Sequence, residues 1–312
     1  MSDWTVTPPD AGTRLDKFLA AASRLGSRGK AAAALERGKV YLNGVEAVLR
    51  DASRLLTEGD RVRIWMDRPG SAKTRPRVGI VGDLDVVYED DRLIVVNKPP
   101  GLLSVPLERN PGIPSIYDQI EDRFRPLGKL RPLVVHRIDQ DTSGLVVFAK
   151  DDDAQARLKE QFKRREAERI YRAVVYGTPD PAEGTWRDFL AWDEKRLIQK
   201  YTHPKDPRAS EAVSHYRTLE RLRGATLIEV RLHTGRRNQV RIQARLRGHT
   251  LVGEKRYVFG PDTLRPIVFS RHALHAYRLA FRHPETDGLL ELSAEPPADF
   301  RELISRLRSK AS

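Results

Sequence analysis

The sequence predicts a small α/β-type domain followed by a larger α+β domain with a mixed, mainly antiparallel sheet. Two observations predict this organisation. Residues 13–66 carry two helical patterns and then short alternating strands, and a segment rich in Pro, Gly and charge follows them. From residue 83 to residue 308, strand-like runs dominate with few regular strand–helix alternations, which favours α+β over a doubly wound sheet.

Two helices open the small domain. The first is predicted from an apolar face with helical spacing, formed by Leu15, Phe18, Leu19 and Ala22. Ser27 is a candidate N-cap for a second helix that runs through Ala31 to Leu35. Gly38 is well placed to end that helix, because glycine adopts the backbone conformation of helix C-termini without strain.

Short strands complete the small domain. Val40 and Leu42 alternate as in a strand, and Asn43-Gly44 is a strong signal for a tight turn. A second turn is expected at residues 58–60, before the alternating Val62 and Ile64. We therefore expect the small domain at residues 12–67, a linker at 68–79 and the larger domain at 80–310.

Apolar runs place six strands in the larger domain: Val86–Tyr88, Leu93–Val96, Leu133–Val135, Leu145–Phe148, Tyr171–Tyr176 and Thr226–Leu232. A helix is expected from the acidic cluster at 151–153 to about Arg165, since acidic residues begin it and basic residues end it. A second helix is expected from Arg237 to Arg247.

The chain is strongly basic. Its 312 residues include 56 Lys and Arg against 43 Asp and Glu, a net charge of +13, which indicates a polyanionic partner. A merely soluble basic surface is the alternative. The chain has no Cys, so a thiol nucleophile, a disulfide framework and Cys-ligated metal are excluded. No signal peptide or membrane-length apolar run is found, so we expect a cytoplasmic protein without membrane contact.

The segment from His136 to Gly144 concentrates titratable residues between two apolar strands. Such a loop is where binding and catalytic groups gather. The alternative is a tight turn in which Asp141 bonds the backbone of the next two residues. From these residues alone, either Asp139 or Asp141 could be the acting carboxylate. Ser143 lacks the spacing of a nucleophile elbow, and neither metal-binding nor phosphate-binding motifs occur, so no cofactor and no metal are expected.

Residues 221–256 form the most basic segment, with Glu229 and Glu254 as their only acidic residues. Arg237, Arg241 and Arg245 are spaced by four and would line one helix face, where like charges repel. An RNA phosphate backbone would relieve that repulsion. A solvated face with Glu partners is the alternative.

The pattern from Arg14 to Asp60, including "RGKVYLNG", resembles the RNA-binding domain first described in ribosomal small-subunit protein S-four. The resemblance implies that its two helices present basic residues to RNA phosphates. The expected contacts in this domain are Arg28, Lys30, Arg37 and Lys39. A flexible linker would let these contacts add to those of the larger domain through effective concentration.

The larger domain resembles the RluA-type pseudouridine synthases. The motifs that carry the resemblance are "VVYEDDRLIVVNKPPGLLSVP" (86–106), "HRIDQDTSGLVVFAK" (136–150), "RIYRAVVYG" (169–177), "ASEAVSHYRTLER" (209–221), "TGRRNQVRIQ" (234–243), "GHTLVGEKRY" (248–257) and "RHALHAYRLAFRHP" (271–284). The resemblance implies an isomerase that acts on uridines, most often in large-subunit ribosomal RNA, as a cytoplasmic monomer without a cofactor.

The resemblance also assigns residues. It implies Asp139 as the catalytic aspartate, Arg137 as the residue that fills the space of the flipped base, and Tyr171 as a stacking platform. Arg241 would pair with Asp139 and hold it ionised. Further RNA contacts are expected from Arg236, Arg237, Asn238 and Arg245. The chain departs from the family at Asn238, where His is common, and at Glu254, where Asp is usual.

Two other functions compete with this interpretation. A non-catalytic RNA-binding or assembly factor could have kept the fold, although intact Asp139, Arg137, Tyr171 and Arg241 argue against it. A glycosidase using Asp139 and Asp141 is the other candidate, but it would need aromatic sugar platforms, and aromatic residues are only 7% of this basic chain.

Overall fold

A computed structural model describes residues 2–36, 38–65, 84–107, 113–125, 130–194, 196, 198–258 and 267–308. The chain divides into two compact units, Met1–Arg77 and Val78–Ser312. The segment 68–79, expected as a linker, lies outside the described residues, as does Arg37.

The small unit is a four-stranded antiparallel sheet in the order β1-β4-β2-β3, with two α-helices and two short 3₁₀ helices. The strands are Ser2–Thr5 (β1), Val40–Leu42 (β2), Val45–Glu46 (β3) and Arg61–Ile64 (β4). The helices are Pro8–Asp10 (η1), Leu15–Leu19 (α1), Arg28–Glu36 (α2) and Leu49–Ser53 (η2).

Most local predictions for the small unit are confirmed. The Ser27 hydroxyl accepts from the Lys30 amide and caps α2. Asn43 and Gly44 both have positive φ, 52° and 81°, as the β2–β3 turn requires. The predicted helical face is wrong at Ala22, which is exposed beyond the end of α1. The prediction also missed β1, which pairs with β4.

The large unit is built on one 11-stranded sheet. Its main path runs β11-β10-β12-β13-β9-β14-β8-β6-β5, with β7 on β8 and β15 on β14. Every pairing is antiparallel except β8 with β14, so the predicted mixed, mainly antiparallel sheet is confirmed. The strands are Val86–Glu89 (β5), Leu93–Lys98 (β6), Leu133–Val134 (β7), Ser143–Ala149 (β8), Glu168–Tyr176 (β9), Glu183–Asp193 (β10), Ile198–Tyr201 (β11), Ser210–Leu222 (β12), Ala225–Leu232 (β13), Leu274–Arg282 (β14) and Leu289–Ser293 (β15).

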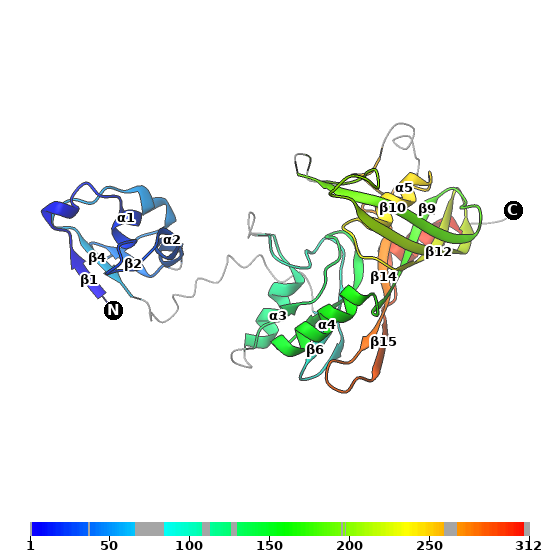
Figure 1. Ribbon diagram of the computed structural model, residues 1–312, viewed down its shortest axis with the longest axis horizontal. Helices are drawn as coiled ribbons and strands as arrows, with labels where there is room; N and C mark the ends of the chain where they lie inside the picture. Colours follow the sequence, from blue (N-terminus) through cyan, green and yellow to red (C-terminus); the bar gives the residue numbers. More distant parts are fainter. Residues whose placement is uncertain are drawn as a thin grey trace. The chain divides into compact units, whose positions relative to one another are not determined.

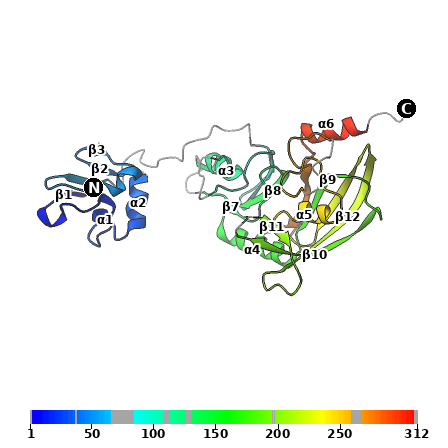
Figure 2. The same ribbon diagram turned by 90° about the horizontal axis from the view of Figure 1, so that it is seen from above.

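Helices cover both faces of this sheet (Figures 1 and 2). They are Ile116–Phe124 (α3), Asp152–Arg164 (α4), Gln239–Leu246 (α5) and Ala298–Leu307 (α6). Strand residues alternate between the two faces. Tyr171 and Ala173 pack with α3 and α5, whereas Val174 packs with α6 on the other side. The residues around Tyr171 therefore face α5.

The predicted helix at 151–165 is confirmed, since the Asp151 carboxylate accepts from the Ala154 amide and caps α4. The predicted helix at 237–247 begins later than expected. Asn238 has a left-handed backbone with φ 56° and precedes the first turn of α5, so Arg237 lies outside the helix. Within the described residues, no helix is long and apolar enough to cross a membrane.

Candidate active site

The loop that carries Asp139 joins β7 to β8 and is fixed mainly through its backbone. The Thr142 amide donates to the Asp139 carbonyl, 3.1 Å away, and closes a turn. The Ser104 hydroxyl donates to the Ile138 carbonyl and also accepts from the Ile138 amide. This turn replaces the alternative in which the Asp141 side chain would organise the segment.

Lys98 anchors the same loop from β6. Its ammonium group is fully buried and donates to the carbonyls of Pro99, Leu102 and Gln140 at 2.7–2.9 Å. Burial lowers the pKa of Lys98 to about 7, with a partly opposing contribution from the Asp141 charge. The three carbonyls leave no ammonium hydrogen for another partner. Lys98 therefore joins the segment after β6 to the residue that follows Asp139.

A second anchor comes from the start of β14. The His272 imidazole lies 2.7 Å from the Thr142 hydroxyl, and Arg271 donates to the Asp141 carbonyl. Burial lowers the pKa of His272 to about 4, so the ring is neutral at physiological pH. Gly144 lets β8 approach β14 closely, because a Cβ there would lie 2.2 Å from the Ala276 carbonyl oxygen.

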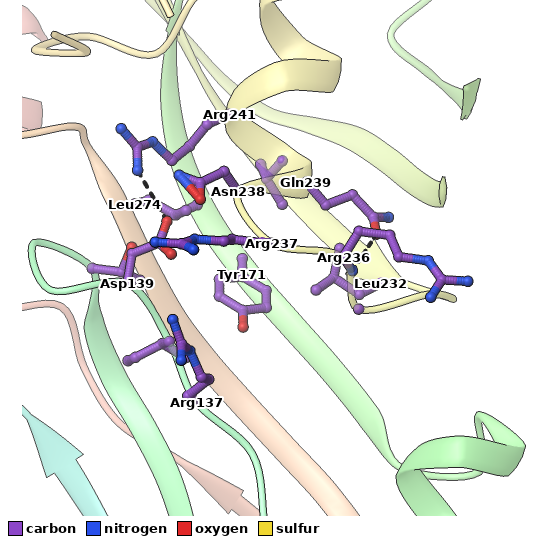
Figure 3. A pocket seen from close by; sticks show the side chains of 14 residues that line it. Arg137, Asp139, Tyr171, Leu232, Arg236, Arg237, Asn238, Gln239, Arg241 and Leu274 are labelled. Carbon is purple, nitrogen blue, oxygen red and sulfur yellow. Dashed lines mark hydrogen bonds and ion pairs between the residues drawn. The ribbon is translucent and has the colours of Figure 1, made fainter. Parts of the chain in front are cut away.

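Arg241 on α5 joins Asp139 to a second carboxylate. One guanidinium nitrogen donates to Asp139 at 3.0 Å, and two others donate to Glu254 at 2.6 and 2.7 Å. The Arg241 and Glu254 side chains are 10% and 0% exposed, so the pair is desolvated. The predicted pairing of Arg241 with Asp139 is present (Figure 3).

The electrostatics of this triad favour one charge state. Burial alone would lower the pKa of Arg241, but its bonds to Glu254 and the nearby Asp139 hold that pKa above its ordinary value. Burial would likewise raise the pKa of Glu254, and the bond from Arg241 instead lowers it to about 2. Arg241 and Glu254 are therefore both charged across the physiological range.

Tyr171 on β9 lines a cavity of about 350 Å³ together with Asp139, Arg137 and Arg241. Figure 3 shows the side chains of Tyr171, Arg137 and Asp139 among the residues that line this cavity. Burial raises the pKa of Tyr171 to about 12, so the phenol stays protonated at neutral pH. The four residues proposed from the sequence as catalytic are thus brought together.

The residues expected to contact RNA have different placements. Arg236 and Arg237 are exposed at the cavity, and Asn238 is buried in its wall. Arg245 is half-buried on α5 and does not line this cavity. Arg237, Arg241 and Arg245 therefore do not line one helix face as expected, because Arg237 precedes the helix and Arg241 is buried between two carboxylates.

In the small unit, Arg28 and Lys30 are exposed and Lys39 is half-buried. Arg24, another arginine of this unit, donates to the Asp10 carboxylate and the Phe18 carbonyl, so it serves the unit's own structure.

The sequence interpretation missed several residues of the site. Glu254 was singled out only as a departure from the family, and Lys98, Thr142 and His272 were given no role. Each acts through a partner far along the chain, so no local spacing reveals it. Burial of a polar or titratable side chain is the signal, and it is visible only in the fold.

The arrangement offers a carboxylate paired with a buried cation, next to a neutral aromatic ring, in an open basic cavity. Among the described residues, no group of three or more His, Cys, Asp or Glu side chains could hold a metal ion. The site can therefore apply a carboxylate and an aromatic surface to an anionic polymer that enters from the basic rim.

Comparisons with known proteins agree on one family for this chain. The profile of RNA pseudouridylate synthases matches residues 92–246, and that of the S4 domain matches residues 13–62. An uncharacterized RNA pseudouridine synthase of Bacillus subtilis is 35% identical over 98% of both chains. Ribosomal large subunit pseudouridine synthase D of Zymomonas mobilis is 35% identical over 97% of this chain and 96% of its own.

Solved structures support the same fold. Human RNA pseudouridylate synthase domain containing 4 has a TM-score of 0.59 at 22% identity, covering 72% of this chain and 93% of its own. Human RNA pseudouridylate synthase domain containing 1 has a TM-score of 0.57 at 20% identity, covering 74% and 97%.

Proposed function

The chain belongs to the RNA pseudouridylate synthase family, with an S4 domain before the catalytic unit, and from this premise we propose that it isomerises specific uridines of large-subunit ribosomal RNA, with Asp139 as the catalytic carboxylate. The observation that carries the proposal is the Asp139–Arg241 pair beside Tyr171 in a basic cavity. A relative of similar length is named for the large ribosomal subunit, which supports that target.

The reaction is a balanced isomerisation. The N1–C1′ bond of uridine breaks, the uracil turns, and a C5–C1′ bond forms, while C5 loses a proton and N1 gains one. Asp139 would either attack C1′ or remove the 2′ proton, and both routes need an ionised carboxylate. Arg241 supports that state, since a neighbouring cation favours the charged form of a carboxylate.

The position of Asp139 in the cavity supports base flipping as part of this proposal. Asp139 lines this cavity with Tyr171 and Leu274, and enzymes that do chemistry on a base commonly take it out of the stack into such a pocket. Tyr171 would stack on the extruded uracil, and the exposed Arg137 would occupy the vacated position. All these residues come from one chain, so we further propose that the active species is a monomer.

The test is pseudouridine mapping of total RNA from cells with and without the gene. We expect one or a few sites in large-subunit ribosomal RNA to disappear on deletion and to return with wild type. Asp139→Asn should not restore them, although the purified variant should bind RNA with nearly wild-type affinity because its size is unchanged. Restoration by Asp139→Asn would refute Asp139 as the catalyst.

Asp141→Asn is the matched control, since it makes the same change two residues away on an exposed side chain. It should keep turnover within about twofold of wild type. If neither cells nor purified wild type form pseudouridine in ribosomal RNA, the non-catalytic RNA-binding alternative is favoured instead.

A further inference from the structure

Arg237 borders three cavities of the large unit. It lines the active-site cavity, a second cavity of about 420 Å³ next to the β10–β11 hairpin, and a third of about 430 Å³ beside Lys255. The first two also share Gly235 and Arg236 in their walls. The second cavity therefore adjoins the position proposed for the flipped uridine.

Arg237, which lines both the active-site cavity and the second cavity, packs against the ring of Trp192. The Arg237 guanidinium carbon lies 4.3 Å from the centre of the Trp192 ring. Trp192 is half-buried near the end of β10, opposite Gln199 of β11, and lines the second cavity. An aromatic ring holds a cation without neutralising its charge. Among the described residues, no carboxylate lies within ion-pair distance of Arg237, so its charge remains available to a ligand.

We propose that the second cavity binds the base of an unpaired nucleotide next to the target uridine, stacked on the Arg237–Trp192 pair. The proposal rests on the proposed function and deepens it, because it gives the substrate a second recognised base. Adjacent nucleotides of one strand can occupy the two cavities, since the cavities share a wall. Arg236 and Arg237 then face the phosphate that joins those nucleotides.

The chemistry of the cavity suits a nucleobase. Its volume lies within the range of about 300–1,000 Å³ found for small-molecule sites. Single-stranded RNA is recognised by stacking on aromatic rings and guanidinium planes, with hydrogen bonds to base edges. Glu194 and Gln199 line the cavity and offer such bonds. Arg208 also lines it but is engaged by Asp206 at 3.1 Å, which leaves Arg236 and Arg237 for phosphate.

The test needs no knowledge of the target uridine. Fluorescein-labelled RNA decamers are made of abasic ribose except for one central uridine or two adjacent uridines, so all carry the same phosphate charge. Binding to the full-length protein is followed by anisotropy at low salt. Wild type should bind the two-uridine decamer about tenfold more tightly, as expected for one stacked base. Trp192→Leu should bind both decamers equally.

Two further variants distinguish loss of base stacking at Trp192 from a general loss of structure in the hairpin. Trp192→Phe keeps an aromatic ring and should retain most of the preference. Tyr201→Leu removes an exposed aromatic from the same hairpin outside the cavity and should retain all of it. Equal binding of both decamers by wild type, or an undiminished preference in Trp192→Leu, would overturn the proposal. Neither result depends on turnover, so failure of the proposed function would be seen separately, as absence of pseudouridine in ribosomal RNA.

Discussion

Arg28 of the small unit and Arg241 of the large unit lie in opposite environments. In the small unit, Arg28 is largely exposed, and its carboxylate neighbour Asp16 lies 4.0 Å away. In the large unit, Arg241 is buried and bonds two carboxylates, one 13 and the other 102 residues away in sequence. Water solvates an exposed cation whether or not it has a partner. A buried cation is stabilised only by its protein partners, so the loss of one of them leaves an uncompensated charge. A substitution at Arg28 should therefore cost less stability than one at Arg241.

Substitution of two glycines, one buried against backbone and one in open space, should give the largest difference in stability. Gly144 and Gly44 both have positive φ, 115° and 81°, but only Gly144 has backbone against it, since a Cβ there would lie 2.2 Å from the Ala276 oxygen. Gly144→Ala should destabilise the large unit by more than about 4 kcal/mol and prevent its folding, since strand β8 must leave β14. Gly44→Ala should cost only about 1–2 kcal/mol of small-unit stability.

Circular dichroism and thermal unfolding of the two variants would measure this difference. Soluble Gly144→Ala protein with a wild-type unfolding profile would mean that the stability of the large unit does not depend on the close approach of β8 to β14.

The next largest loss of stability is expected for substitution of Glu254. Glu254→Gln leaves Arg241 buried without its bidentate carboxylate and should lower the free energy of unfolding by about 3 kcal/mol. Because Arg241 also holds Asp139, kcat should fall about a hundredfold, with KM for RNA nearly unchanged. Glu254→Asp, which keeps the charge, should recover part of kcat.

The same pair predicts a pH dependence. The pKa of Glu254 is about 2 in the folded protein, below its ordinary value of 4.5. A depressed pKa gives stability that is present above pH 4.5 and is lost as the pH falls towards 2. The stability difference between wild type and Glu254→Gln should therefore shrink over this interval in urea titrations. A constant difference would show that Glu254 is not ionised in the folded state.

Asp188→Asn is the matched control for Glu254→Gln. Asp188 is also buried and bonds an arginine, Arg247, at 2.7 Å, but it does not line the active-site cavity. The Asp188→Asn variant should be less stable than wild type but should not show the hundredfold fall in kcat. Equal loss of kcat in both variants would make Glu254 a structural residue rather than one that positions Arg241.

This contrast also explains what the sequence could predict. The Ser27 hydroxyl caps a helix through an amide three residues away, and the backbones of Asn43 and Gly44 form the turn between two consecutive strands, so local patterns predict the cap and the turn correctly. The same reasoning fails for Arg241, because its spacing from Arg237 and Arg245 indicated a phosphate-binding face. Its true partners come from the β7–β8 loop and from the segment after α5. The pairing of Asp139 with Arg241 was predicted from the family resemblance, because the spacing of residues within one helix gives no information about a partner 102 residues away.

Removal of the small unit should have an intermediate effect. Without residues 1–77, the protein should bind large-subunit ribosomal RNA about tenfold more weakly, because the effective concentration supplied by a second binding unit is lost. The slope of log affinity against log salt should also become shallower, since fewer phosphates are contacted. The kcat at saturating RNA should be kept, because the site residues all lie in 78–312. An unchanged salt slope would contradict an RNA-binding role for the small unit.

The smallest effect is expected for single exposed cations of the small unit. Lys30 is exposed in the first turn of α2, and its side chain makes none of the hydrogen bonds or ion pairs found among the described residues. Lys30→Ala should leave thermal unfolding unchanged, weaken RNA binding about threefold, and lower the salt slope by about 0.9, the value for one phosphate contact. Lys163→Ala on α4 makes the same charge change at an exposed site of the large unit, and it should alter the slope less. Equal slopes for the two variants would mean that net charge alone, and not the face of α2, attracts the RNA.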